Sequence, residues 1–165
     1  MPEGLDAKIV GPDDGRTVRL FGVRFDYKVE SADSGGTLAV LEVTIPPHTL
    51  VKPHSHTRED EFSLVLDGTV GIRTGHNVAE ATEGSYLVKP RGIPHAMWNA
   101  SDKPARVIEM LSPGGLEEYF EKLGPILAHE GGAGAKEYYE LAETYGITIE
   151  DDWIEELEKT YGVKL

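Results

Sequence analysis

The sequence predicts an all-β sandwich or barrel that is followed by a helical extension. From about residue 16 to residue 111, short apolar runs such as TLAVLEVTI and EFSLVL alternate with turn segments such as SADSGG and PRGIPH. Many short strands at close spacing are typical of sandwiches and barrels, whereas a parallel sheet needs helices between its strands. After Pro113 the apolar residues recur at helical spacing. We therefore divide the chain into a β-barrel domain over residues 1–111 and a helical extension over residues 112–165.

Three segments of the extension have helical periodicity. GLEEYFEKL places four apolar side chains on one face, and AKEYYELAETY and EDDWIEELEKTY show the same spacing. Thr148 and Asp151 resemble a capping box at the start of the third helix. No pair of ligand-type side chains lies on these helices, so we expect them to pack on the barrel or on a second subunit.

The composition excludes several classes of function. The formal net charge is -13, and residues 112–165 alone carry 13 acidic and 4 basic residues. Such a chain repels phosphate backbones, so we expect no nucleic-acid partner. The absence of cysteine rules out disulfides and thiolate ligands. The first residues lack the features of a signal peptide, and no apolar run approaches the ~18 residues of a membrane span, so we expect a cytoplasmic protein without a membrane partner.

Three histidines fall in two short segments of the β domain. In PHSHTREDEF, His54 and His56 are two residues apart, and side chains at i and i+2 of a strand point to the same side. A third histidine, His95, follows a later strand in KPRGIPHAMWN. An isolated pair would be interpreted as surface histidines, but three imidazoles at the edge of a core predict a metal site.

Three acidic residues follow the histidine pair, and strand parity distinguishes them. Uninterrupted alternation from the pair would turn Asp60 inward. TRED reads as a polar turn, however, after which the parity restarts and Glu61 begins the next strand. We therefore prefer Glu61 as the ligand and place Glu59 and Asp60 in a solvated turn.

The same alternation predicts the walls of a cavity around the site. Side chains that share a strand face with Glu61, His95 or Gly84 should point inward. These side chains are Ser63, Val65, Met97, Tyr86 and Val88. Mostly apolar walls with a few polar groups are typical of a site for a small molecule, which is the partner that we expect.

The two histidine segments resemble the motifs of the cupin superfamily. The first cupin motif runs Gly, five residues, His-x-His, three or four residues, Glu, six residues, Gly. The sequence HTLVKPHSHTREDEFSLVLDG matches it over residues 48–68, except that His48 stands at the leading glycine. The second motif runs Gly, five residues, Pro-x-Gly, two residues, His, three residues, Asn, and GSYLVKPRGIPHAMWN matches it throughout over residues 84–99.

The resemblance implies an all-β jelly-roll barrel, also called a double-stranded β-helix, that holds a metal. It implies that the ligands are His54, His56, Glu61 and His95. Three imidazoles and one carboxylate suit one divalent transition metal, and Fe, Mn, Ni, Co, Cu and Zn all stay open. Glu61 would also act as a general base towards a substrate hydroxyl. His48 is either a solvated turn residue or an outer residue of the pocket at the barrel mouth.

The segment SPGGLEEYFEKLG resembles the tail of bacterial single-barrel cupins grouped with quercetinase-like dioxygenases. This resemblance implies an enzyme, a metal-dependent dioxygenase that acts on a small phenolic or enolic compound. Two alternatives stay open: a metal-dependent isomerase, lyase or hydrolase on the same barrel, and a non-catalytic cupin that binds a small molecule. Cupins of this size commonly pair through their barrels, so we also expect a homodimer.

Overall fold

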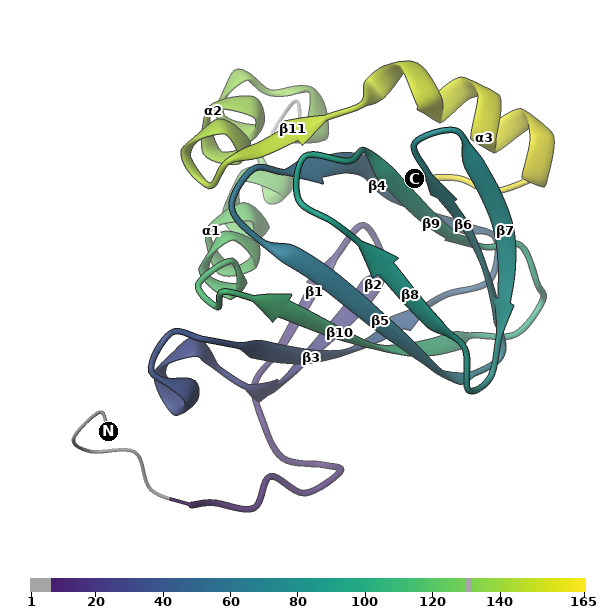
Figure 1. The fold of residues 1–165 in the computed structure, drawn as a ribbon. Helices are drawn as coiled ribbons and strands as arrows, with labels where there is room; N and C mark the ends of the chain where they lie inside the picture. Colours follow the sequence, from purple (N-terminus) through teal and green to yellow (C-terminus); the bar gives the residue numbers. More distant parts are fainter. Residues whose placement is uncertain (1–6, 130–131) are drawn as a thin grey trace.

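The computed structural model describes residues 7–129 and 132–165 and contains two antiparallel sheets that face each other (Figure 1). One sheet has the strand order β1-β2-β3-β10-β5-β8, and the other has the order β11-β4-β9-β6-β7. This arrangement confirms the predicted jelly-roll barrel with a helical C-terminal part. The strands are β1 (Thr17–Leu20), β2 (Val23–Val29), β3 (Ala39–Ile45), β4 (Thr49–His56), β5 (Asp60–Asp67), β6 (Thr69–Thr74), β7 (Asn77–Thr82), β8 (Tyr86–Lys89), β9 (His95–Asn99), β10 (Ala105–Ser112) and β11 (Ile147–Ile149).

The core lies between the two sheets and follows from the two-residue alternation of the strands. In β3, every second side chain is buried, and β10 has the same pattern. Residues Leu41 and Val43 of β3 pack inside with Val107 of β10 and Val65 of β5. Each apolar side chain of this size contributes about 1.5 to 3 kcal/mol when it is fully buried. The core therefore fixes which face of each strand points into the barrel.

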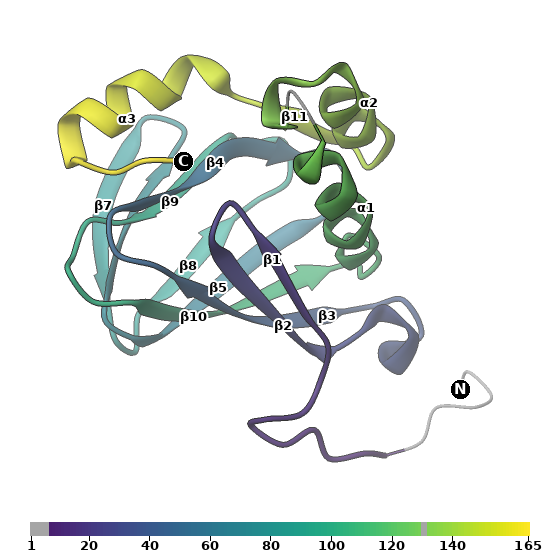
Figure 2. The ribbon, with the colours of Figure 1, turned by 180° about the vertical axis from the view of Figure 1, so that it is seen from behind.

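In the described part of the extension, three helices follow the barrel, namely α1 (Glu117–Ala128), α2 (Lys136–Thr144) and α3 (Ile154–Tyr161), and they match the three predicted segments. Figure 2 shows α1 and α2 beside the end of the barrel near β1 and β11, and α3 across the outside of the second sheet. There α3 packs Leu157 against Leu50 and Trp98, and the Tyr161 ring stacks on Trp98 at 4.4 Å. Within the described residues, no helix has both the length and the apolar composition that crossing a membrane requires.

The extension also contains a strand that the sequence analysis did not predict. Residues Ile147–Ile149 form β11, which pairs antiparallel with β4 and places Ile147 opposite His56 and Ile149 opposite His54. The predicted capping box at Thr148 is therefore wrong, since Thr148 lies in this strand and α3 begins after a 3₁₀ turn over Asp151–Trp153. β-Branched side chains favour the strand once the edge of β4 is available to pair. The extension thereby supports the strand that carries two of the predicted metal ligands.

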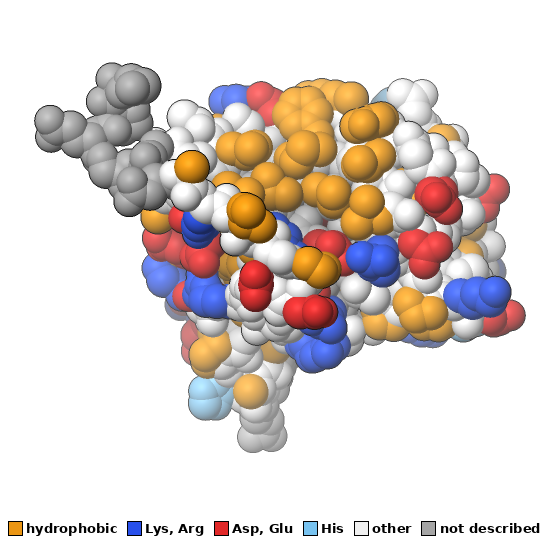
Figure 3. Space-filling view, turned by 90° about the horizontal axis from the view of Figure 1, so that it is seen from below, with side chains coloured by type: hydrophobic (Ala, Val, Ile, Leu, Met, Phe, Trp, Pro, Cys, Tyr) orange, Lys and Arg blue, Asp and Glu red, His pale blue; other side chains and the backbone are white. Residues whose placement is uncertain are grey.

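The outer face of the first sheet carries exposed apolar side chains. Phe62 lies opposite Val88 in β8 and opposite Met110 in β10, and Tyr86 follows on the same face. Figure 3 shows apolar side chains gathered into a patch on this side of the molecule. The predicted homodimer stays a prediction, which sedimentation velocity of the purified chain would test by measuring its mass.

A buried carboxylate holds the beginning of α1 against the barrel. Glu117 accepts hydrogen bonds from the backbone N–H groups of Ser31 and Gly115, both at 2.7 Å, and its own carbonyl accepts one from the Tyr27 hydroxyl at 2.9 Å. Burial alone would raise the pKa of Glu117, but the donors at Ser31 and Gly115 outweigh it and hold the pKa below its ordinary value. The ionised carboxylate is therefore part of the folded structure.

We expect Glu117→Gln to lower the free energy of unfolding at neutral pH by about 2 kcal/mol, because a neutral amide can replace only one of the two charge-assisted bonds. A group with a lowered folded pKa stabilises the fold above its unfolded pKa, and this contribution is lost as the pH falls through the folded value. Urea unfolding of both proteins between pH 7 and pH 3 measures this effect. The difference between them should shrink as the pH falls, and a difference that does not change with pH would contradict the assignment.

Candidate metal centre

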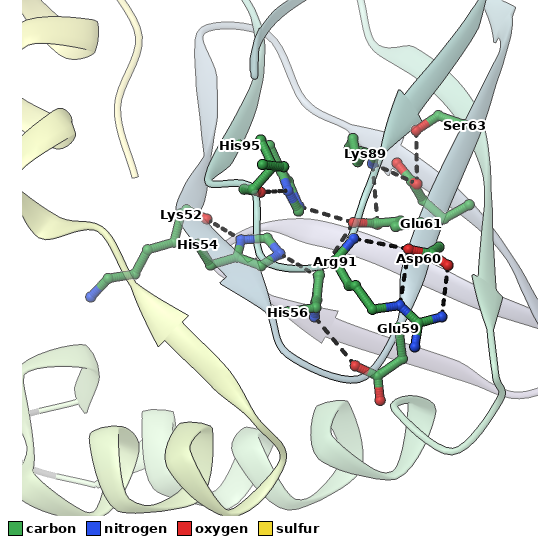
Figure 4. Close-up of polar contacts among 12 residues, drawn as sticks. Lys52, His54, His56, Glu59, Asp60, Glu61, Ser63, Lys89, Arg91 and His95 are labelled. Atoms are coloured by element: carbon green, nitrogen blue, oxygen red, sulfur yellow. Dashed lines mark hydrogen bonds and ion pairs between the residues drawn. The ribbon is translucent and has the colours of Figure 1, made fainter. Parts of the chain in front are cut away.

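The four predicted ligands come together inside one end of the barrel. His54 and His56 lie on β4, Glu61 is the second residue of β5, and His95 begins β9. Pairing of β4 with β9 places His54 directly opposite His95. One ligand atom from each of the four side chains lies within 4.8 Å of the others. Figure 4 shows the three imidazoles and the Glu61 carboxylate directed at one another.

Hydrogen bonds on the far side of two imidazoles orient them towards the centre. The Nδ1 atoms of His54 and His95 lie 2.6 and 3.2 Å from the carbonyl oxygens of Lys52 and Ile93. A carbonyl only accepts, so each Nδ1 carries the proton and each Nε2 presents a lone pair. The Nε2 atoms face inward: that of His54 lies 3.1 Å from Nε2 of His56. Backbone acceptors of this kind are the usual outer partners of histidine ligands to metals.

The protonation states suit a cation. Burial lowers the pKa of His54 well below its ordinary value and lowers the pKa of His95 as well, so both imidazoles are neutral. Burial would raise the pKa of Glu61, but the ammonium of Lys89 holds that pKa well below its ordinary range. Metals bind the deprotonated forms of these side chains, and the structure already favours them.

Two buried acceptors in the centre lack a hydrogen-bond donor in the part of the chain that the structure describes. They are Oε2 of Glu61 and Nε2 of His95, which lie 3.0 Å apart. Two lone pairs at this distance repel each other, and a shared cation would turn the repulsion into coordination. Three imidazole nitrogens and one carboxylate oxygen therefore fit a divalent transition-metal ion, and the donor set alone does not choose among the six candidates.

The neighbouring carboxylates take other positions. Asp60 pairs with Arg91 at 2.7 Å, and Arg91 holds the pKa of Asp60 at about 2. The prediction that Glu59 lies in a solvated turn is wrong, because Glu59 is buried and its Oε2 lies 3.8 Å from Nδ1 of His56. Glu59 therefore contacts the outer edge of a ligand imidazole, while only Glu61 reaches the centre.

The predicted cavity residues divide into two groups. Ser63, Val65 and Met97 are buried inside the barrel, and Met97 lines the cavity beside the histidines. The prediction for Tyr86 and Val88 is wrong, since these side chains are 72% and 60% exposed on the outer face.

The pairing of β5 with β8 explains this error. It places Tyr86 opposite Leu64 and Val88 opposite Phe62, so that Leu87 and Lys89 share the inward face with Ser63 and Glu61. Parity counted from Gly84 fails because Gly84 lies in the preceding turn with φ at 82°, and the strand begins only at Tyr86.

His48 does not reach the pocket, so the alternative that placed it there is wrong. It lies in the turn before β4 with φ at 54°, the left-handed conformation that the glycine of the motif would adopt easily. Its Nε2 lies 2.8 Å from the exposed carboxylate of Asp102. His48 is therefore a solvated turn residue at the opposite end of β4 from His54 and His56.

Two buried charged residues beside the centre were missed by the sequence analysis. Nζ of Lys89 lies 3.1 Å from Oε1 of Glu61 and 2.8 Å from Oε2 of Glu109, which also accepts a 2.8 Å hydrogen bond from Ser63. Burial raises the pKa of Glu109 to about 8, against the opposing charge of Lys89. The signal was present in ARVIEML, where a glutamate interrupts an alternating apolar face between Val107 and Leu111.

The centre opens onto two adjoining apolar cavities of about 70 Å³ each. Both cavities contact His54 and His56, and they share the aromatic rings of Phe25 and Phe120, which stack at 4.8 Å. One cavity is lined by Glu61 and His95, and the other extends beneath α1 and α2 to Tyr119 and other apolar side chains. The helical extension therefore forms part of the wall of the space in front of the candidate ligands.

Comparisons with known proteins agree with the fold and the motifs. Residues 41–111 match the family model described as a cupin domain. The chain is 32% identical over 77 residues to H2HPP isomerase from Bacillus subtilis and 34% identical over 76 residues to germin-like protein subfamily T member 2 from Arabidopsis thaliana. These matches cover 46% and 43% of this chain, but only 32% and 34% of the relatives, about a third of their length.

The structure of KdgF from Halomonas sp. superposes with a TM-score of 0.61 at 16% identity. The superposition covers 68% of this chain and 99% of that one, which shows a shared fold. The family match, the fold and the two histidine motifs all concern the same barrel. The barrel of this chain is therefore of the cupin type, with a match to the cupin domain over residues 41–111.

Proposed function

We propose that this chain is a metal-dependent dioxygenase that acts on a small phenolic or enolic compound with at most one ring. One observation carries the proposal: three imidazoles and a carboxylate converge at the end of a largely apolar cavity. A metal held there would face a water-poor space, which suits a substrate whose body is apolar and whose oxygen is polar.

The cavity walls support the size and the character of this substrate. The cavity nearest the centre is lined by six apolar side chains, which are Phe25, Val43, Val51, Met97, Leu116 and Phe120. The two adjoining cavities together approach the roughly 150 Å³ of an engineered apolar cavity that binds benzene. This volume supports one ring rather than the three rings of a flavonol.

The residues of the chain have defined tasks in this proposal. His54, His56, His95 and Glu61 would hold the ion, and a divalent transition metal supplies Lewis acidity towards a phenol or enol oxygen and, if it is redox-active, electron transfer with dioxygen. The ammonium of Lys89 holds Oε1 of Glu61, which leaves Oε2 directed at the imidazoles. Oε1 of Glu61 contacts Lys89, and Oε2 points at the imidazoles, so neither oxygen is directed at a substrate proton. The role of Glu61 as a general base therefore stays a prediction.

An isomerase is the second candidate, and the buried acid–base groups beside the cavity favour it. Burial raises the pKa of Glu109 to about 8, and the residue lies in hydrogen-bonding contact with Lys89, so the pair could exchange a proton with a substrate. The similarity to a protein named H2HPP isomerase points in the same direction. A reaction of this kind would need no dioxygen.

An oxygen electrode tests the proposal. We expect the iron-reconstituted chain to consume dioxygen with catechol or acetylacetone, and the His95→Ala variant treated in the same way to consume none above the buffer rate. Consumption that persists in the variant would contradict the assignment of the centre. Conversion of an enolisable ketone under strictly anaerobic conditions would support the isomerase instead.

A further inference from the structure

Glu109 is a buried carboxylate with one oxygen engaged and the other free of hydrogen bonds. The residue is 5% exposed and lines the same cavity as the four candidate ligands. Its Oε2 accepts from both Ser63 and Lys89, at 2.8 Å each. Its Oε1 is inaccessible to solvent and finds no hydrogen-bond partner among the residues that the structure describes.

A buried carboxylate oxygen without a partner is costly, because it has lost water and gained nothing in return. Such groups are rare in folded proteins, and those that persist often serve a site. The cavity walls combine six apolar side chains with the four candidate ligands and Lys89, and among the described residues none of these polar groups donates to Oε1. A ligand in the cavity could provide one.

The position of Glu109 sets where such a ligand group must lie. Lys89 bridges Glu109 and Glu61 through contacts of 2.8 and 3.1 Å, so the bridged oxygens of the two carboxylates are at most about 6 Å apart. Because the two carboxylates line the same cavity, a polar group that reaches the free Oε1 of Glu109 shares that cavity with Oε2 of Glu61, the oxygen that faces the metal centre. Two neighbouring groups on one small ring would meet both sites.

We propose that Glu109 is a specificity residue that binds a second hydroxyl of the substrate, next to the oxygen directed at the metal centre. The inference rests on the proposed function and narrows its substrate class to vicinal diols of the catechol type and to enols with an adjacent hydroxyl. A substrate hydroxyl satisfies Oε1 in place of water, and a ring without this hydroxyl leaves the oxygen unpaired. Selection by a buried hydrogen-bonding group is stronger than selection by apolar shape alone.

Calorimetric titration with a matched pair of probes tests this inference without measuring turnover. Catechol carries the second hydroxyl, and 2-fluorophenol has nearly the same shape but cannot donate there. We expect the cobalt(II)-loaded chain to bind catechol more tightly than 2-fluorophenol by at least about tenfold, the effect of one well-placed buried hydrogen bond.

The variants separate this hydrogen bond from chelation of the metal by catechol. In Glu109→Met we expect catechol affinity to fall at least about tenfold while 2-fluorophenol affinity and cobalt content stay unchanged, because Lys89 keeps Glu61 as a partner. Glu109→Gln preserves the side-chain volume and serves as the second variant if Glu109→Met unfolds. Its affinity for catechol should fall at least about threefold, and its affinity for 2-fluorophenol should not change. Glu42→Gln is the control, since Glu42 pairs with Arg106 on the outside of the sheet.

The outcomes distinguish the two proposals. A catechol preference that both Glu109 variants retain would come from chelation and would overturn the role of Glu109, while leaving the proposed function in place. Binding of neither probe to the cobalt-loaded wild type would overturn the proposed function and this inference together. Loss of the preference in the variants with unchanged 2-fluorophenol binding supports the inference.

Discussion

Replacing Lys89 with methionine is expected to lower the free energy of unfolding by about 3 to 5 kcal/mol. Lys89 is 2% exposed and lies between two buried carboxylates, Glu61 and Glu109. Without its ammonium, the Glu61 carboxylate loses the positive charge that keeps it ionised inside the barrel. Removing one partner of a buried ion pair lowers the free energy of unfolding far more than replacing both partners with apolar residues does. Denaturant unfolding of the metal-free proteins measures the loss.

Two further variants show whether burial is the cause. Lys122→Met removes a surface lysine that contacts Glu118 at 3.7 Å on α1, and we expect a loss below about 1 kcal/mol. The double variant Lys89→Met/Glu109→Met should regain at least about 1 kcal/mol of unfolding free energy relative to Lys89→Met. The second substitution removes the carboxylate that Lys89→Met leaves buried without a partner. Equal losses for the two single lysine variants, or strict additivity in the double variant, would contradict this account of the cluster.

Replacing His95 with alanine is expected to raise the dissociation constant for a divalent transition metal by more than about 100-fold. His95 provides one of the four converging ligand atoms, and changes even to the outer partners of metal ligands cost 10- to 100-fold. Competition with a chelating dye measures the affinity directly. His48→Ala is the matched control, since His48 lies in a solvated turn away from the centre, and its affinity should equal that of the wild type. Equal affinity in His95→Ala would show that the metal binds elsewhere.

The barrel and three of the four candidate ligands were predictable because they depend on short-range patterns. Alternating apolar residues specify β3 and β10 whatever their partners are, and the histidine spacing places His54 and His56 on one side of β4. Turn residues fix the break that gives Glu61 its inward direction. The two cupin motifs then supply His95, which no local pattern connects to the first pair.

The remaining features depend on pairing between distant strands, which a sequence read segment by segment does not contain. Tyr86 and Val88 face outward because β8 pairs with β5 in a particular register, and a shift by one residue would have reversed both. The contact of Lys89 with Glu109 requires β10 and β8 to flank β5. Similarly, residues Ile147–Ile149 become a strand only because the edge of β4 is there to pair with them.

The metal content of the untagged, purified chain tests the central claim most directly. Element-resolved mass spectrometry should find about one transition-metal ion per chain, and the variant His54→Ala/His95→Ala, purified in parallel, should lose it. The identity of the ion would at the same time choose among the six candidates. If the wild type holds no stoichiometric metal even after anaerobic reconstitution, the cluster of His54, His56, Glu61 and His95 is not a metal centre, and the proposed enzyme function fails with it.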